Sequence, residues 1–176
     1  MNVCIVKNRP IMYNITTGKD EHMERIASFS VDHDYITPGI YVSRVDGDVT
    51  TYDLRTRKPN TAPLMSHAEM HSVEHLFATF ARNSAIADSV IYFGPMGCQT
   101  GFYFLVRNAR HAAVIDAIKG ILKQIINYTD EMPGKSPKEC GNYANLDVEL
   151  ARAVCAAYYG LVKDWTESGL AYPTAG

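Results

Sequence analysis

Apolar and polar residues alternate in several short stretches in the first two thirds of the chain. Phe29 and Val31 are separated by polar neighbours, and runs rich in β-branched and aromatic residues follow, bounded by turn signals. Such runs are typical of β-strands, and the acidic-glycine segment 46–48 is typical of a hairpin turn between two of them. The predicted strands are residues 28–33, 40–45, 49–55, 90–93 and 102–107.

Two stretches in the second half of the chain have helical spacing. In residues 111–128, Val114, Ile118, Ile121 and Ile125 recur every three or four positions and predict one apolar face. Residues 146–165 predict a final helix in the same way. The residues predicted to face the core from this last helix are Leu150, Val154, Ala157, Tyr158, Leu161 and Val162.

A further helix is predicted over residues 66–82, with Ser66 as its N-cap, and its two faces differ in chemistry. Val73, Leu76 and Phe77 gather on one side, whereas His71 and His75 lie on the opposite side, one turn apart. Two imidazoles at this spacing can reach a single ion. The alternative is a solvated polar face that is rich in histidine, and the helix alone does not decide between the two.

Strands, a helix, strands and two helices follow one another along the chain. This order predicts an α+β fold, a two-layer sandwich of a mostly antiparallel sheet with helices on one face. A homodimer is the simplest cover for the other face. Residues 25–165 are predicted to form a single catalytic domain, with 1–24 as a peripheral extension and 166–176 as a loose C-terminal tail.

The composition of the chain limits the kinds of partner and the cellular location that can be expected. The 176 residues are 47% hydrophobic and 20% charged, with a net charge of −2, which argues against binding to nucleic acid or to a membrane surface. No apolar run approaches the roughly 20 residues that span a bilayer. Four cysteines in a chain of this length do not make a disulfide framework, so a reducing, cytoplasmic location is predicted.

The glycine-rich segment 94–101 presents Cys98 in a specialised turn, where a thiol is more open to chemistry than in a packed helix. A purely structural role for this cysteine is the alternative. Cys155 lies at the edge of an apolar stripe and is predicted to pack in the core. Arg55 begins a basic cluster that is either solvated surface or a site for an anionic substrate group.

Five motifs, in order along residues 25–165, resemble the S-ribosylhomocysteine lyase (LuxS) family. The most specific are residues 71–75, with the pattern His-x-x-Glu-His, and 95–101, with the sequence Pro-Met-Gly-Cys-Gln-Thr-Gly. The others are residues 28–33, residues 52–55 with the following Pro59-Asn60, and residues 139–141. Each motif alone is weak, and their common order carries the resemblance.

The resemblance implies a metal site made by His71, His75 and Cys140, holding a divalent metal that is ferrous iron in the family, with zinc or cobalt tolerated. It implies that Glu74 and Cys98 exchange protons with the substrate. The residues that it implies for binding S-ribosylhomocysteine are Ser28, His33 and Arg55. It also implies a homodimer whose active sites lie at the subunit interface.

The sequence departs from the family pattern at Tyr92-Phe93-Gly94 before the Cys98 turn and at Thr56-Arg57 after Arg55. Neither change removes a ligand or a proton-transfer group, so an active enzyme is predicted. The main alternative is a zinc metallopeptidase, which shares the His-x-x-Glu-His helix and needs a further carboxylate ligand, for which Glu149 is the available candidate. A non-catalytic metal-binding relative is the third.

Overall fold

The computed structural model of the protein describes residues 31–174. Four strands form one antiparallel sheet in the order β1-β2-β4-β3. They are β1 (Gly39–Asp46), β2 (Val49–Arg55), β3 (Val90–Pro95) and β4 (Gly101–Arg107). The helices are α1 (His67–Ala81), α2 (His111–Ile126) and α3 (Val148–Val162). Short 3₁₀ turns, η2 (Ala87–Ser89), η3 (Tyr143–Asn145) and η4 (Glu167–Gly169), lie in the connections.

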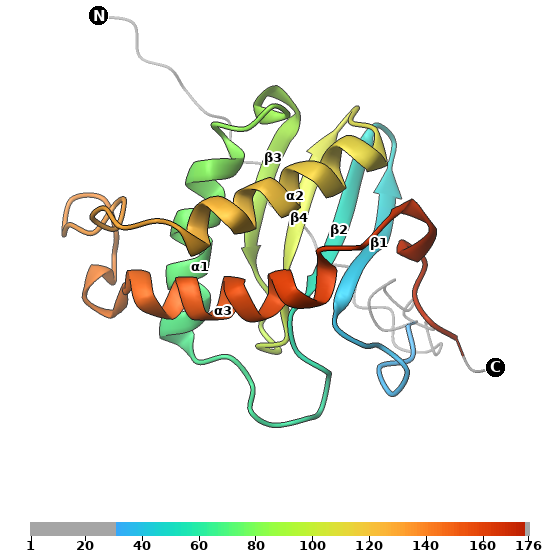
Figure 1. Cartoon of the computed structure of the whole chain (residues 1–176), viewed down its shortest axis with the longest axis horizontal. Coiled ribbons are helices and arrows are strands. Elements are labelled where there is room, and N and C mark those ends of the chain that lie inside the picture. The colour runs from blue at the N-terminus through green and yellow to red at the C-terminus, as the bar shows by residue number, and fades with distance from the viewer. Residues whose placement is uncertain (1–30, 175–176) are drawn as a thin grey trace, which may run out of the picture.

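Figure 1 shows α2 and α3 crossing one face of the sheet, with α1 beside β3 and behind the other two helices. The predicted α+β class and antiparallel sheet are confirmed. The hairpin turn is also as predicted, because Gly47 adopts a left-handed φ of 61° between β1 and β2.

Aromatic side chains from three elements hold α1 against the sheet. The ring of Phe77 stacks on Phe93 of β3 at a centroid distance of 4.0 Å and meets the edge of Phe104 of β4 at 5.5 Å. All three rings are buried. Stacked and edge-on aromatic pairs add to the hydrophobic free energy of burial, so the apolar face of α1 is fixed and its histidine face is turned away from the core.

Two features of the helices and strands differ from the sequence prediction. In α3, Leu161 is 55% exposed and Ala157 is exposed, although both were predicted to face the core, and Ala151 is buried; Cys155 is buried, as predicted. The buried stripe is thus narrower than the apolar pattern indicated. Residues 31–33, predicted as the end of a strand, form a bend and the start of a turn; Ser28 and the rest of that predicted strand lie outside the described residues, as does the extension 1–24.

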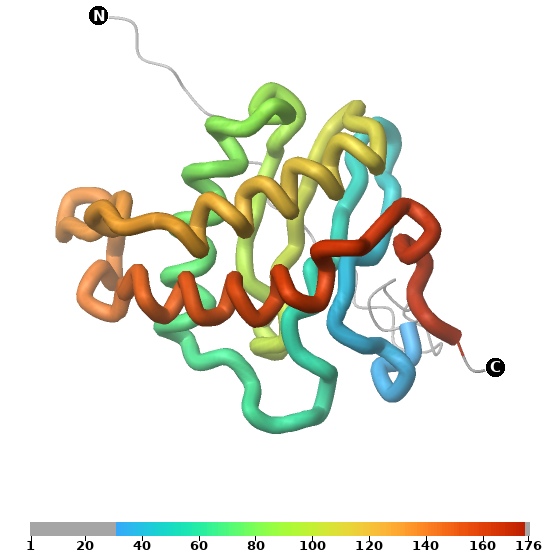
Figure 2. Tube along the Cα trace, viewed as in Figure 1, coloured from blue at the N-terminus to red at the C-terminus, as the bar shows by residue number. Residues whose placement is uncertain are grey.

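The segment after α3 is not the loose tail that its composition suggested. Leu170 is buried, and its carbonyl accepts a hydrogen bond of 2.8 Å from the backbone N–H of Val42 in the edge strand β1. Figure 2 shows this C-terminal segment returning past β1. Trp165 packs so closely on Gly39 that a side chain at that glycine would collide with the indole ring.

Candidate functional site

The two histidines of α1 sit together on the outer face of the helix. Ser66 caps α1 with a reciprocal capping box to Glu69, which fixes where the helix begins. His71 and His75 are then one turn apart, and their rings meet edge to face with centroids 4.7 Å apart. Their proximity follows from helical geometry alone.

Cys140 comes from the loop between α2 and α3. Its Sγ lies 3.3 Å from Nε2 of His71, and the ligand atoms of His71, His75 and Cys140 all lie within 4.8 Å of one another. Nitrogen and sulfur ligands of one tetrahedral ion are separated by about 3.5 Å, given metal–ligand bonds of about 2.1 and 2.3 Å. The structure therefore places the three predicted ligands at a spacing that fits one ion.

Both imidazoles are oriented by a partner at the nitrogen that faces away from this cluster. Nδ1 of His71 donates to the Asn145 side-chain oxygen at 2.6 Å, and Nδ1 of His75 donates to the Pro133 carbonyl at 2.9 Å. Each ring is thereby held in the tautomer that leaves Nε2 without a proton, as a metal ligand needs.

The loop that supplies these partners is fitted closely to α1. At Gly134, with φ of 72°, a Cβ would lie 3.0 Å from Nδ1 of His75, so a side chain there would crowd the ring. Further along the loop, the backbone N–H of Asp147 donates to the buried Ser72 hydroxyl of α1 at 2.9 Å. These contacts place Asn145 against His71.

The donor set suits a metal of intermediate softness. Two imidazoles and a thiolate are ligands that zinc and ferrous iron accept, and three protein ligands leave room for a substrate or solvent oxygen. The peptidase alternative is not supported, because the Glu149 carboxylate is paired with Arg152 at 2.7 Å and is no member of the cluster. Glu74 is half-buried on α1, one residue before His75.

A second cluster surrounds Cys98, which is exposed in the turn between β3 and β4. The turn is closed by hydrogen bonds between Met96 and both Gln99 and Gly101. The Cys98 thiol lies 3.0 Å from the Thr100 hydroxyl and 3.9 Å from Nη1 of Arg55. The Thr100 hydroxyl and the Arg55 guanidinium are thus the polar neighbours of this exposed thiol.

Arg55 is held from two sides. Its Nη1 donates to the Thr100 hydroxyl at 2.5 Å, and its Nη2 pairs with the Asp53 carboxylate at 2.5 Å. Arg55 is 3% exposed and Asp53 is 0% exposed. Burial raises the pKa of the Asp53 carboxyl, and the charge of Arg55, the Tyr172 hydroxyl and the charge of His33 act in the opposite direction.

The predicted substrate-binding residues are thus partly assembled. Arg55 lies beside Cys98. Nδ1 of His33 contacts the Val31 carbonyl at 2.9 Å. Ser28 lies outside the described residues. In the part of the chain that the structure describes, no hydrogen bond or ion pair joins the Cys98 cluster to His71, His75 or Cys140.

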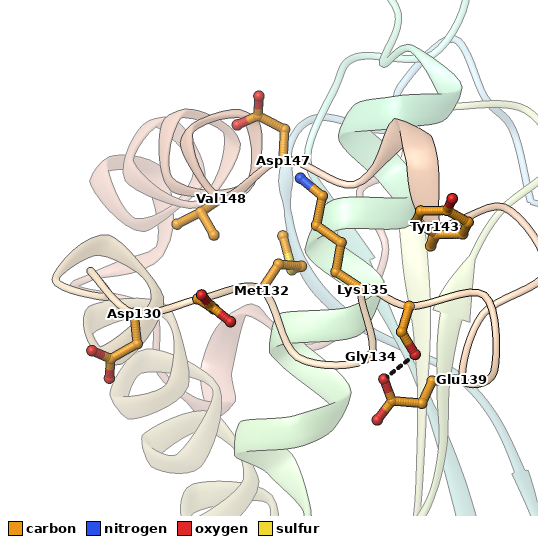
Figure 3. A pocket seen from close by; sticks show the side chains of 10 residues that line it. Asp130, Met132, Gly134, Lys135, Glu139, Tyr143, Asp147 and Val148 are labelled. Atoms are coloured by element: carbon orange, nitrogen blue, oxygen red, sulfur yellow. Dashed lines mark hydrogen bonds between the residues drawn. The ribbon is translucent and has the colours of Figure 1, made fainter.

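An open hollow of about 720 Å³ lies beside the loop that carries Cys140. Figure 3 shows the Lys135 side chain extending toward Asp147 and the hydrogen bond between Ser136 and Glu139 at its margin. Ten residues between Asp130 and Val148 line the hollow, and His71, His75 and Cys140 are not among them.

The fold and the site together define an α+β protein with a His₂Cys candidate metal centre and a separate thiol–arginine cluster. No helix among residues 31–174 is long and apolar enough to cross a membrane. The S-ribosylhomocysteinase (LuxS) family model matches residues 26–168, and the chain belongs to this family. The resemblance read from the five motifs is confirmed.

Several S-ribosylhomocysteine lyases are similar to most of this chain. The S-ribosylhomocysteine lyase of Finegoldia magna is 44% identical over 156 residues, which are 86% of this chain and 99% of the relative. Those of Borreliella afzelii and Clostridium beijerinckii are each 40% identical, over 86% of this chain and 100% and 99% of their own lengths. The similarity therefore covers nearly the full length of these relatives and 86% of this chain.

Several residues that complete the site were missed at the level of sequence. Asp53 had a signal, because it lies two positions before Arg55 in a strand and so shares its face. Thr100 also had one, since it is two residues from Cys98. Asn145, the Pro133 carbonyl and Tyr172 had none, because their contacts depend on how a loop and the C-terminal segment fold back.

Proposed function

We propose that this chain is an S-ribosylhomocysteine lyase, a carbon–sulfur lyase that forms homocysteine and 4,5-dihydroxy-2,3-pentanedione, the precursor of autoinducer-2. The observation that carries the proposal is the convergence of His71, His75 and Cys140 within 4.8 Å in a chain of this family. The reaction has two stages, carbonyl migration and β-elimination, and each needs residues near that centre that can transfer protons.

The bond to be broken is a thioether, and no neighbouring group activates it. Its cleavage becomes feasible if the sugar carbonyl moves from C1 to C2 and then to C3. A carbonyl at C3 acidifies the proton on C4, and removal of that proton expels the homocysteine sulfur from C5 as a thiolate. Each migration transfers one proton from a carbon to its neighbour, so the site needs groups that take and return protons.

His71, His75 and Cys140 would hold a divalent metal, which we propose to be ferrous iron, with zinc or cobalt able to replace it. When bound, the ion acts as a Lewis acid toward carbonyl and enediolate oxygens. Asn145 and Pro133 orient the two imidazoles for this task. The carboxylate of Glu74, on the same helix, lies outside the ligand set.

Glu74 and Cys98 are the proposed proton-transfer groups. Glu74 precedes His75 in α1 and would act on the carbons nearest the metal centre. Cys98 is exposed on a tight turn, with Thr100 and Arg55 within reach of its sulfur. Arg55 and His33 would bind the substrate on the side of Cys98, and Ser28 is proposed to join them.

A homodimer with active sites at the interface is part of the proposal. The metal cluster and the Cys98 cluster have no hydrogen bond between them within residues 31–174, so one chain does not visibly join them. Apposition of two chains would bring the histidine face of one subunit to the thiol turn of the other. Light scattering should return twice the chain mass, and a monomeric mass for active protein would contradict this arrangement.

The proposal is tested by incubating purified, iron-loaded protein with S-ribosylhomocysteine and measuring homocysteine with a thiol reagent after removal of the protein. Wild type should release homocysteine, and His71→Ala should not. Glu149→Gln serves as the matched control, because it removes the carboxylate that a peptidase would need and should leave homocysteine release unchanged. Loss of both metal and homocysteine release in Glu149→Gln would place Glu149 in the metal site and contradict the proposed ligand set. The free thiols of Cys98 and Cys140 accord with the reducing, cytoplasmic location that we also propose.

A further inference from the structure

The C-terminal segment reaches the Cys98 cluster through a single tyrosine. After η4, the carbonyl of Leu170 is bonded to Val42 at 2.8 Å, where the register of β1 shifts between Val42 and Arg44. The chain then places Tyr172 over the outer face of the sheet. There its ring stacks on Tyr41 with centroids 4.9 Å apart and an interplanar angle of 27°.

Tyr172 lies over two paired residues. Tyr41 of β1 is opposite Asp53 of β2 in the antiparallel register, so their side chains share one face of the sheet. The Tyr172 hydroxyl donates to Asp53 Oδ2 at 2.8 Å. The same Oδ2 accepts from Arg55 Nη2.

A continuous series of contacts therefore runs from the C-terminal segment to the Cys98 thiol. Tyr172 bonds Asp53, Asp53 bonds Arg55, and Arg55 bonds Thr100 and approaches Cys98. The pair in the middle is buried, which strengthens each contact and makes a lost partner costly. Two polar atoms of this pair, Asp53 Oδ1 and Arg55 Nε, have no hydrogen-bond partner among the described residues. The hydrogen bonds to Asp53 Oδ2 and from the Arg55 Nη atoms therefore hold the two side chains in place.

Tyr172 lies beyond the residues 26–168 that the family model matches. The sheet face and the Cys98 turn, by contrast, are inside that span. The contact thus joins a residue outside the matched residues to residues inside them.

We propose that residues 167–172 form a C-terminal strap, in which Tyr172 is a positioning residue that fixes Arg55 beside Cys98 through Asp53. The inference deepens the proposed function, on which its catalytic readout rests. Without the hydroxyl, Asp53 loses one of its two partners at Oδ2, and the guanidinium gains freedom to turn away from the thiol. Ring stacking on Tyr41 needs no hydroxyl and is retained in a phenylalanine variant.

The strap is tested first without the enzyme reaction, by the rate at which iodoacetamide alkylates Cys98, followed by mass spectrometry of the full-length, metal-loaded protein. Tyr172→Phe should slow Cys98 alkylation at pH 7 by about three- to tenfold, the range expected from the net loss of one ordinary hydrogen bond, because the hydroxyl acts on the thiol only through Asp53 and Arg55. Metal content should not change. Tyr92→Phe is the matched control, since Tyr92 is 50% exposed and no hydrogen bond of its hydroxyl is recorded among residues 31–174.

A double-mutant cycle separates positioning from a general structural effect. In Arg55→Lys, which keeps the charge but loses the planar fork, adding Tyr172→Phe should produce no further slowing. An unchanged alkylation rate in Tyr172→Phe would contradict the positioning role of Tyr172. So would a slowing that persists in full in the Arg55→Lys background, because the effect would then bypass Arg55.

The catalytic readout is the second part of the same experiment. Tyr172→Phe should lower kcat/KM for S-ribosylhomocysteine by a factor similar to the fall in alkylation, and Tyr92→Phe should leave it unchanged. If wild type released no homocysteine, the proposed function would fail, but the alkylation rates would still test whether Tyr172 positions Arg55 beside Cys98. A slowed alkylation with an unaltered kcat/KM would overturn the link between this positioning and catalysis.

Discussion

Removal of the Asn145 side chain should weaken metal binding without removing any ligand. In the native protein, Nδ1 of His71 donates to Asn145 Oδ1 at 2.6 Å. Asn145→Ala leaves that N–H with solvent as its only partner and lets the ring turn or change tautomer. Residues that orient metal-bound histidines typically affect metal affinity 10- to 100-fold.

The structure places the expected effect at the lower end of that range. His71 is still confined by the His75 ring at 4.7 Å, and His75 keeps its own bond to the Pro133 carbonyl. The Ser72–Asp147 contact still holds the loop to α1. We therefore expect about a tenfold rise in Kd, which corresponds to ~1.4 kcal/mol.

The assay is competition for zinc or ferrous iron against a chromophoric chelator at fixed pH. Asn145→Asp is the informative partner variant, because a carboxylate accepts the same hydrogen bond and should bind metal at least as tightly as wild type. Asn142→Ala is the control, since Asn142 lies in the same loop with an exposed side chain. Equal affinities for wild type and Asn145→Ala would refute the orienting role.

Further predictions follow from the separation of ligands, proton-transfer groups and core. His71→Ala, His75→Ala and Cys140→Ala should each lose metal and activity together, as measured by elemental analysis; full occupancy in Cys140→Ala would remove that residue from the ligand set. Glu74→Gln and Cys98→Ala should keep the metal, and their turnover should fall by about 100- to 10,000-fold. Labelled substrate should show that a ketose intermediate accumulates. Normal homocysteine release by either variant would contradict the proton-transfer role of that residue. Burial raises the pKa of the Cys155 thiol to about 12. Between pH 9 and 12 the thiol therefore stays protonated in the folded state, whereas it ionises in the unfolded chain. The stability that the buried thiol contributes is present below pH 9 and is lost as the pH rises toward 12. The free energy of unfolding of wild type relative to Cys155→Ala should therefore fall by on the order of 1 kcal/mol between pH 8 and 10, and a constant difference would contradict it.

Local patterns were sufficient to predict most of the fold. The helical repeat and the Ser66 cap gave α1 nearly to the residue, and the glycine at 47 gave the β1–β2 turn. The spacing of His71 and His75 likewise predicted that both rings could reach a single ion. These features depend on residues within a few positions of one another, which is what periodicity can detect.

Longer-range features were predicted less well or not at all. Cys140 is 69 residues from His71 and was assigned only through the family resemblance, because nothing in its own neighbourhood shows which helix its loop will contact. Leu161 continues the apolar stripe of α3 in sequence but points to solvent, since α3 buries only a narrow face. Tyr172 looked like part of a loose tail because its contacts, to Tyr41 and Asp53, are with strands more than a hundred residues away.

The central claim is that this chain cleaves S-ribosylhomocysteine by carbonyl migration and elimination at the His71–His75–Cys140 centre. The most direct measurement is product stoichiometry for the iron-loaded wild-type protein, with homocysteine determined as thiol and the diketone trapped as its adduct with an aromatic 1,2-diamine. Migration followed by β-elimination predicts the two products in equal amounts, and neither from His75→Ala. Homocysteine released together with free ribose, or no homocysteine from fully metallated protein, would contradict the account.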